Sequence, residues 1–176
     1  LLLKDASKIQ GTLKEDYAYL EDRARLSLSW LISQQEVLKK YDSLNTNRLF
    51  FDALAFYTLS AALNNEDAKK LGGEFFKRAL ERQAPAGYFL ESGGYDSSYQ
   101  GVSLLRGLIL YLYIDNNDPL RQSFLQQLAQ GIKWQRGRIK ESGEINTTGN
   151  TRVYPGGEEY IGNEKGVAYV DTALAF

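Results

Sequence analysis

The chain has 176 residues, 43% of them hydrophobic and 24% charged, and a net charge of −1, so we expect one globular domain over residues 1–176. It contains no basic stripe and no apolar run of ~20 residues, so we expect neither a nucleic-acid partner nor a membrane span. It also lacks Cys and His, which excludes disulfides, zinc sites built on Cys, and Ser-His-Asp catalysis. We expect no metal and no cofactor, and any catalysis must use Asp, Glu, Tyr, Lys or Arg.

The first half of the chain predicts three helices. Apolar residues recur at helical spacing over residues 13–40, which predicts one long helix. Thr46 is a predicted N-cap for a second helix over residues 47–63, which is apolar on nearly every side. Two asparagines interrupt that pattern, and a third helix with acidic residues in its first turn is predicted over residues 66–83.

The second half of the chain predicts three more helices and one long loop. A fourth helix over residues 99–115 is apolar on most faces. The dipeptide that begins with Asp118 is typical of a helix start and predicts a fifth helix over residues 119–137. The loop over residues 141–163 is rich in Gly and Thr, and Asn163 is a predicted N-cap for a sixth helix that runs to the last residue.

The second, fourth and sixth helices are apolar all round, whereas the third and fifth have a clearer polar face. This alternation predicts an all-α array of αα-hairpins, forming an arc or partial α/α toroid with short extended segments in the loops. Three hairpins are half of a full ring, so we expect an open arc, a fragment of a larger ring, or half of a ring completed by a second copy or another domain. Alignment of the inner helices makes Asp52, Arg106 and Asp171 equivalent, either as a pair between helices or as the polar floor of a cleft.

The stretch ESGGYDSSYQGVSLLRGL, residues 91–108, begins the fourth helix. Ser97 and Gln100 fit a capping box, and the two glycines supply the preceding turn. Capping does not explain Tyr95, Asp96 and Tyr99, which gather where backbone N–H groups point outward. Such a helix N-terminus suits an anionic or hydroxyl-rich ligand.

A second candidate segment, NTTGNTRVYPGGEEY, lies within the long loop. Arg152 and Tyr154 alternate in a run that we expect to be extended, so both side chains point the same way. Arg152 can bind a carboxylate, while Glu158 and Glu159 are either acid/base groups or part of a solvated loop. Because this segment and the one before the fourth helix both lead into inner helices, we expect them to lie on the same rim.

Two short stretches carry a resemblance to a known class of proteins. QAPAGYF (residues 83–89) resembles the Gln-x-x-x-Gly-x-aromatic turn between hairpins of helical toroids, and YDSSYQ (residues 95–100) resembles the Asp-Gly-Ser-aromatic segment of polysaccharide lyases. The chain is thus similar to the αα-hairpin toroids of polysaccharide lyases and glycoside hydrolases. The resemblance implies that Tyr99 transfers a proton and Arg152 holds a uronate carboxylate, with Asp96 as a third catalytic candidate. The other candidates are assigned to substrate binding: Tyr95, Gln100, Arg106, Tyr154, Glu158, Glu159, Asp52 and Asp171.

The leading hypothesis is therefore a carbohydrate-active protein that acts on or binds an acidic polysaccharide, by β-elimination if it is catalytic. One alternative is a non-catalytic helical-repeat module that binds an unknown ligand. Another is a glycoside hydrolase, which needs two carboxylates across one cleft, for which Asp96 with Glu158 or Glu159 is the candidate pair. The sequence leaves the compartment open, and a glycan ligand implies export to the periplasm or the cell exterior.

Overall fold

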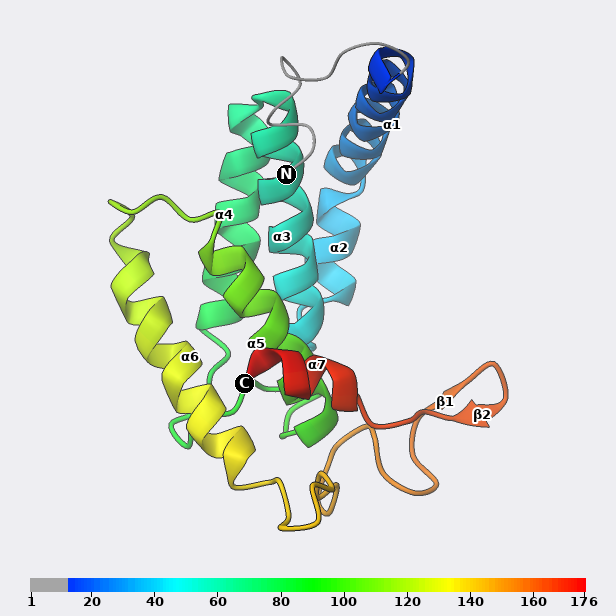
Figure 1. The fold of residues 1–176 in the computed structure, drawn as a ribbon, viewed down its shortest axis with the longest axis vertical. Coiled ribbons are helices and arrows are strands. Elements are labelled where there is room, and N and C mark those ends of the chain that lie inside the picture. Colours follow the sequence, from blue (N-terminus) through cyan, green and yellow to red (C-terminus); the bar gives the residue numbers. More distant parts are fainter. Residues whose placement is uncertain (1–12) are drawn as a thin grey trace.

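The computed structural model describes residues 13–176, with side chains from residue 16 onward, and it is mostly helical (Figure 1). The prediction of an all-α protein is confirmed, because the described residues contain only one short two-stranded ribbon besides the helices. The elements in chain order are α1 (Leu13–Ser33), α2 (Gln35–Tyr41), α3 (Thr46–Leu63), α4 (Glu66–Leu80), α5 (Ser97–Tyr111), α6 (Leu120–Arg136), β1 (Glu159–Tyr160), β2 (Asn163–Glu164) and α7 (Tyr169–Ala175).

Helices α1, α3, α5 and α7 pack against one another in succession, while α4 packs on α3 and α6 on α5. Helix α3 contacts α1, α4 and α5, and α5 in turn contacts α6 and α7, as Figure 1 shows. The antiparallel β1–β2 ribbon projects from the loop that leads to α7. Its turn places Ile161 and Gly162 at φ of 53° and 74°, the left-handed backbone that a tight two-residue hairpin requires. Within the part of the chain that the structure describes, no helix has the length and apolar character needed to span a bilayer.

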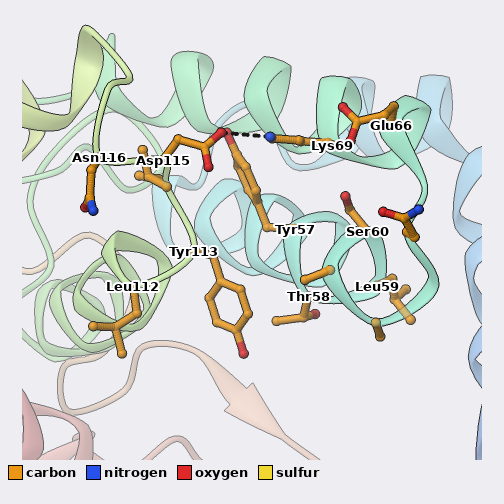
Figure 2. Close-up of a pocket in the computed structure, with 14 residues that line it drawn as sticks. Tyr57, Thr58, Leu59, Ser60, Glu66, Lys69, Leu112, Tyr113, Asp115 and Asn116 are labelled. Carbon is orange, nitrogen blue, oxygen red and sulfur yellow. Dashed lines mark hydrogen bonds and ion pairs between the residues drawn. The ribbon is translucent and has the colours of Figure 1, made fainter. Parts of the chain in front are cut away.

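A pocket of about 670 Å³ opens between the C-terminal ends of α3 and α5 and the first turns of α4 (Figure 2). The ammonium group of Lys69 pairs with the carboxylate of Asp115 across it, at 2.7 Å, and both side chains are at least partly exposed. This pocket lies at the opposite end of α3 and α5 from the segments that the sequence singled out.

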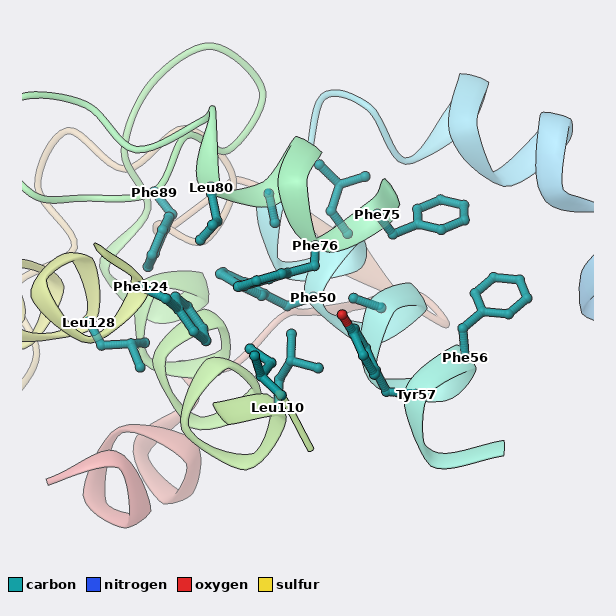
Figure 3. Close-up of a cluster of buried hydrophobic side chains, with 14 of the residues drawn as sticks. Phe50, Phe56, Tyr57, Phe75, Phe76, Leu80, Phe89, Leu110, Phe124 and Leu128 are labelled. Atoms are coloured by element: carbon teal, nitrogen blue, oxygen red, sulfur yellow. The ribbon is translucent and has the colours of Figure 1, made fainter. Parts of the chain in front are cut away.

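The core is a cluster of phenylalanine rings from α3, α4, α6 and the segment before α5 (Figure 3). The ring of Phe50 contacts that of Phe89 edge-on, with centroids 5.1 Å apart, and lies 5.9 Å from that of Phe124. Phe124 also meets Phe76 at 4.7 Å. Each ring is completely or almost completely buried, and burying a Phe side chain stabilises a fold by about 1.5–3 kcal/mol. These rings fix the two helical pairs, α3 with α4 and α5 with α6, against one another.

Several predicted helix boundaries are wrong, including those of the fourth helix, which spans Ser97–Tyr111 rather than residues 99–115. The helix predicted over residues 13–40 is broken by a turn at Gln34, which separates α1 from α2. Thr46 lies inside α3 rather than before it, because its hydroxyl donates to the carbonyl of Leu90 at 2.7 Å instead of capping the helix. The third helix ends at Leu80, and the sixth begins at Tyr169 because Asn163, its predicted cap, belongs to β2.

Candidate functional site

The N-terminal ends of α3, α5 and α7 lie together at one end of the molecule. The backbone N–H of Asn47, in the first turn of α3, donates to the carboxylate of Glu91 at 2.7 Å. The hydroxyl of Ser97, at the start of α5, donates to the carbonyl of Asn146 at 2.7 Å. The N–H of Ala168, just before α7, donates to the hydroxyl of Ser98 at 2.9 Å. The structure thus confirms that the long loop and the segment before α5 share one rim.

Asp96 fastens the long loop to the start of α5. One of its carboxylate oxygens accepts from the backbone N–H groups of Ser98 and Tyr99, at 3.0 and 3.1 Å, and so caps the helix. The other oxygen accepts from the N–H groups of Arg152 and Val153, at 3.0 and 2.7 Å. The side chain is completely buried. Asp96 therefore is the cap of α5, a role that the sequence assigned to another residue, and it has no exposed oxygen for a ligand.

The predicted capping box of Ser97 and Gln100 is wrong, because both side chains have tertiary partners. Ser97 faces the long loop, where its N–H donates to the side-chain oxygen of Asn150 at 2.9 Å. Gln100 points into the core: its side-chain oxygen accepts from the N–H of Phe89 at 2.8 Å, and its amide donates to the carbonyl of Gly131 at 3.4 Å. Gln100 is buried and is thus a structural residue that joins α5, α6 and the preceding turn.

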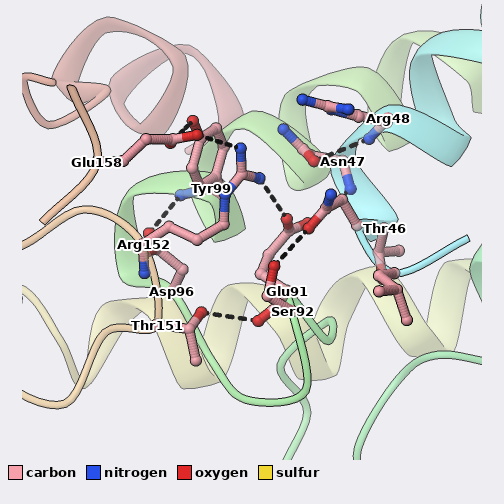
Figure 4. A network of polar contacts seen from close by, with 12 residues as sticks. Thr46, Asn47, Arg48, Glu91, Ser92, Asp96, Tyr99, Thr151, Arg152 and Glu158 are labelled. Atoms are coloured by element: carbon pink, nitrogen blue, oxygen red, sulfur yellow. Dashed lines mark hydrogen bonds and ion pairs between the residues drawn. The ribbon is translucent and has the colours of Figure 1, made fainter. Parts of the chain in front are cut away.

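Next to Asp96 lies a network of polar and charged side chains that we call the rim cluster, made of Glu91, Tyr99, Arg152, Glu158 and Lys165. Figure 4 shows the first four of them. The guanidinium of Arg152 bridges Glu91 and Glu158, at 3.0 and 2.9 Å, and lies 4.0 Å from the centre of the Tyr99 ring. The Tyr99 hydroxyl donates to Glu158 at 2.7 Å, and Lys165 approaches the same carboxylate oxygen at 3.3 Å.

The rim cluster has a buried side and an exposed edge. The environment of each group determines its protonation state. The side chains of Glu91 and Arg152 are 1% and 10% exposed, whereas those of Glu158 and Lys165 are 31% and 36% exposed. Burial raises the pKa of Glu91 to about 7, against the opposing hydrogen bond from Asn47 and the charge of Arg152. Burial also works to raise the pKa of Glu158, but the hydrogen bonds from Arg152 and Tyr99 outweigh it and lower that pKa to about 2.

Tyr99 is held in its protonated form. Burial is the main reason that its pKa lies above the usual value, and the hydrogen bond to Glu158 adds to the rise. At neutral pH the cluster therefore presents a protonated phenol beside an ionised carboxylate. A phenol in this state donates a hydrogen bond readily but is a poor base.

Arg106 and Asp171 form the ion pair that the alignment of helices allowed, with 3.3 Å between nitrogen and oxygen, and it joins α5 to α7. Asp52 is not part of this pair. One of its carboxylate oxygens is buried with no hydrogen-bond partner among the described residues. Burial, with a further contribution from the charge of Asp42, raises its pKa to about 7.

Three further candidates lie outside the rim cluster. The predicted extended run at Arg152 and Tyr154 is a turn, closed by hydrogen bonds to the carbonyls of both residues, so Tyr154 is 44% exposed. Glu159 is exposed in β1. The hydroxyl of Tyr95 donates to the carbonyl of Thr148 at 3.1 Å. Within the described residues, no hydrogen bond or ion pair joins these three side chains to the rim cluster.

The sequence did not nominate three residues that hold the site together. Glu91 is the buried partner of Arg152, Lys165 is the exposed partner of Glu158, and the side-chain amide of Asn150 bonds to the carbonyl of Val153. Only Glu91 had a usable signal: it is a lone carboxylate between an apolar run and a glycine turn, and a charge buried there needs a partner.

In residues 13–176, no group of three or more His, Cys, Asp or Glu side chains is placed to hold a metal ion. Comparison of the chain with known proteins found no match among family models, characterised proteins or solved structures.

Proposed function

We propose that the chain is an arc of αα-hairpins whose rim cluster binds an acidic polysaccharide without cleaving it. The packing order supports the arc: α3, α5 and α7 are successive neighbours with their N-terminal ends together, and α4 and α6 connect them. A second copy or another domain would then complete the ring, which a measurement of the molar mass in solution tests.

The observation that carries the proposal is the position of Lys165 in the rim cluster. The carboxylate of Glu158 already receives hydrogen bonds from Arg152 and Tyr99, at 2.9 and 2.7 Å. The bond from Lys165 is longer, at 3.3 Å, and comes from a more exposed side chain. Lys165 can therefore turn to the carboxylate of a uronate residue while Glu158 keeps two donors, so that no buried charge is left unpaired.

The remaining polar groups at the exposed edge fit the hydroxyl groups of a sugar. The ionised carboxylate of Glu158 accepts hydrogen bonds, and a ligand hydroxyl can donate to it beside the Tyr99 phenol. A flexible polymer that binds through one charge-assisted bond and a few hydroxyl contacts at each site needs several such contacts for tight binding.

The chemistry of the cluster favours binding over β-elimination. In a lyase, a tyrosine that removes a proton must first lose its own, and the burial of Tyr99 works against that step. Arg152, the candidate for holding the uronate, is already committed to two carboxylates. Hydrolysis by Asp96 with Glu158 or Glu159 is also disfavoured, because both oxygens of Asp96 are buried and accept backbone hydrogen bonds.

Affinity electrophoresis in gels containing polygalacturonate, with neutral dextran as the control polymer, tests the proposal. We expect the protein to be retarded by polygalacturonate alone, and Lys165→Ala to weaken this about tenfold, since a charge-assisted hydrogen bond contributes about 1.5 kcal/mol or more. Lys140→Ala is the matched control, because Lys140 is an exposed lysine that pairs with Glu144 outside the cluster.

Three outcomes would overturn the proposal. The first is the absence of retardation of the unaltered protein, and the second is equal loss in both lysine variants. The third is the formation of unsaturated sugar ends, detected by ultraviolet absorbance, that stops in Tyr99→Phe. That result would replace binding with the lyase reaction that the resemblance implies.

A further inference from the structure

A second surface, separate from the rim cluster, lies beside the C-terminal half of α6. There the turn that contains Pro85 and the residues Gln130, Lys133, Trp134 and Arg138 line an open groove of about 500 Å³. The groove shares no lining residue with the rim cluster. From the stretch QAPAGYF, Pro85 and Ala86 line the groove.

Trp134 is held in place by two tyrosines behind it. Its ring centre lies 5.3 Å from that of Tyr88 and 5.4 Å from that of Tyr95, and the two tyrosines are 5.6 Å apart. Three rings in mutual contact leave little freedom for any one of them. Arg138 also lies 5.7 Å from the centre of the Trp134 ring. Trp134 therefore lines the groove as a fixed aromatic side chain, and an aromatic ring of this kind suits the apolar face of a sugar ring.

The charges along the groove are positive. The guanidinium of Arg138 donates to the carbonyls of Asn146 and Thr148, at 2.8 and 2.6 Å, and lies 5.0 Å from the Tyr95 ring. Its Nε is buried without a hydrogen-bond partner among the described residues. Lys133 is exposed and also lines the groove, and none of the described residues that line it carries a carboxylate. This combination attracts an anion rather than a neutral group.

We propose that this groove is a second saccharide site, which takes a uronate residue with its apolar face against Trp134 and its carboxylate at Lys133. The choice of ligand class rests on the proposed function, but the site and its residues do not. Only Trp134 among the three rings lines the groove, so the surface lacks the row of aromatic ridges that grips a proline-rich peptide. A polymer held at both the groove and the rim cluster would gain avidity from the two contacts.

Tryptophan fluorescence tests this directly, because the chain has two tryptophans and the other one, Trp30, is 60% exposed on α1. In a Trp30→Phe protein, the emission reports on Trp134 alone. We expect trigalacturonate to change this emission saturably, and maltotriose, a neutral sugar of the same length, to leave it unchanged. Lys133→Ala should weaken the response about tenfold, as the loss of one charge-assisted bond predicts.

Two matched variants separate this inference from the proposed function. Arg136→Ala removes an exposed charge from the same helix without touching the groove, and Lys165→Ala alters only the rim cluster, so both should leave the Trp134 response intact. Circular dichroism on each variant confirms that it is folded.

The groove inference is overturned by the absence of a saturable response, by an equal response to maltotriose or a proline-rich peptide, or by a response that Lys165→Ala abolishes. If polygalacturonate still retards the protein in those cases, only the groove inference fails. If the Trp134 response depends on Lys133 while Lys165→Ala leaves retardation unchanged, the groove inference stands and the rim cluster proposal fails.

Discussion

Asp52 is a partly buried carboxyl group whose ionisation should oppose folding, and Asp52→Asn tests this. One oxygen has no partner, and burial raises the pKa from 3.8 to about 7 in the folded state. Because the folded state binds the proton more tightly, the stabilising effect is complete below pH 3.8 and is lost as the pH rises to about 7. At about 1.4 kcal/mol for each pKa unit, the loss over the whole range is about 4 kcal/mol, and about 3 kcal/mol of it falls between pH 5 and pH 8.

The assay is urea unfolding of the unaltered protein and of Asp52→Asn at both pH values. The amide does not titrate, so the free energy of unfolding of the variant should rise by about 3 kcal/mol relative to the unaltered protein between pH 5 and pH 8. Comparing the two proteins cancels the titration of Glu91, which has a similarly raised pKa. Asp67→Asn is the matched control, since its side chain is 83% exposed. A difference that does not change with pH, or one that changes in the opposite direction, refutes the reasoning.

Further substitutions test the contacts that position the rim cluster and the packing of the helices around it. Asp96→Ala leaves four backbone N–H groups without their acceptor and should lower the free energy of unfolding by about 3–5 kcal/mol, measured by urea titration. Gly101→Ala places a methyl group against α7 and should lower the melting temperature. In α4, by contrast, Gly73→Ala has room for the methyl group and should stabilise the fold by about 0.5–1 kcal/mol. Equal effects of the two substitutions on the melting temperature would contradict this packing. Arg152→Met should cost about 3 kcal/mol by leaving Glu91 unpaired, and less when Glu91→Gln is added, which a double-mutant cycle measures.

The sequence predicted the helices well where the signal is local and less well where a distant segment competes. Periodicity located α3, α4, α5 and α6, because an apolar face must be buried whatever it packs against. The sixth helix is shorter than predicted because residues 159–164 form a hairpin, and the N–H of Lys165 then donates to the carbonyl of Glu158. Nothing local in Asn163 distinguishes a helix cap from a hairpin residue.

The same contrast holds for the candidate site. Its place was predictable, because alternating hairpins bring the starts of alternate helices to one end. The partners of individual side chains were not. Gln100 satisfies a capping pattern, yet its side chain accepts from the N–H of Phe89 and donates to the carbonyl of Gly131 instead. Asp96 is the N-cap of α5, and its second carboxylate oxygen also accepts hydrogen bonds from N–H groups of the long loop. Those loop groups lie more than fifty residues away in the sequence, so only the folded chain brings them to Asp96.

The long loop has anchors other than the Arg152 side chain, so we infer a separate purpose for the buried ion pair. Asp96 accepts from two loop N–H groups, and Thr151 bonds to the carbonyls of Glu91 and Tyr95, at 2.7 and 3.0 Å. A buried ion pair loses much of its attraction to the cost of removing both charges from water. Packed apolar side chains would hold the loop at least as well. What Arg152 adds is a bond to Glu158 at 2.9 Å, which holds that carboxylate at the exposed edge and lowers its pKa. Arg152 is therefore better understood as a positioning residue for Glu158 than as a ligand for the sugar. On this argument Arg152→Met keeps the loop in place but raises the pKa of Glu158, which a carbon-13 NMR titration of the glutamate carboxyl groups would detect.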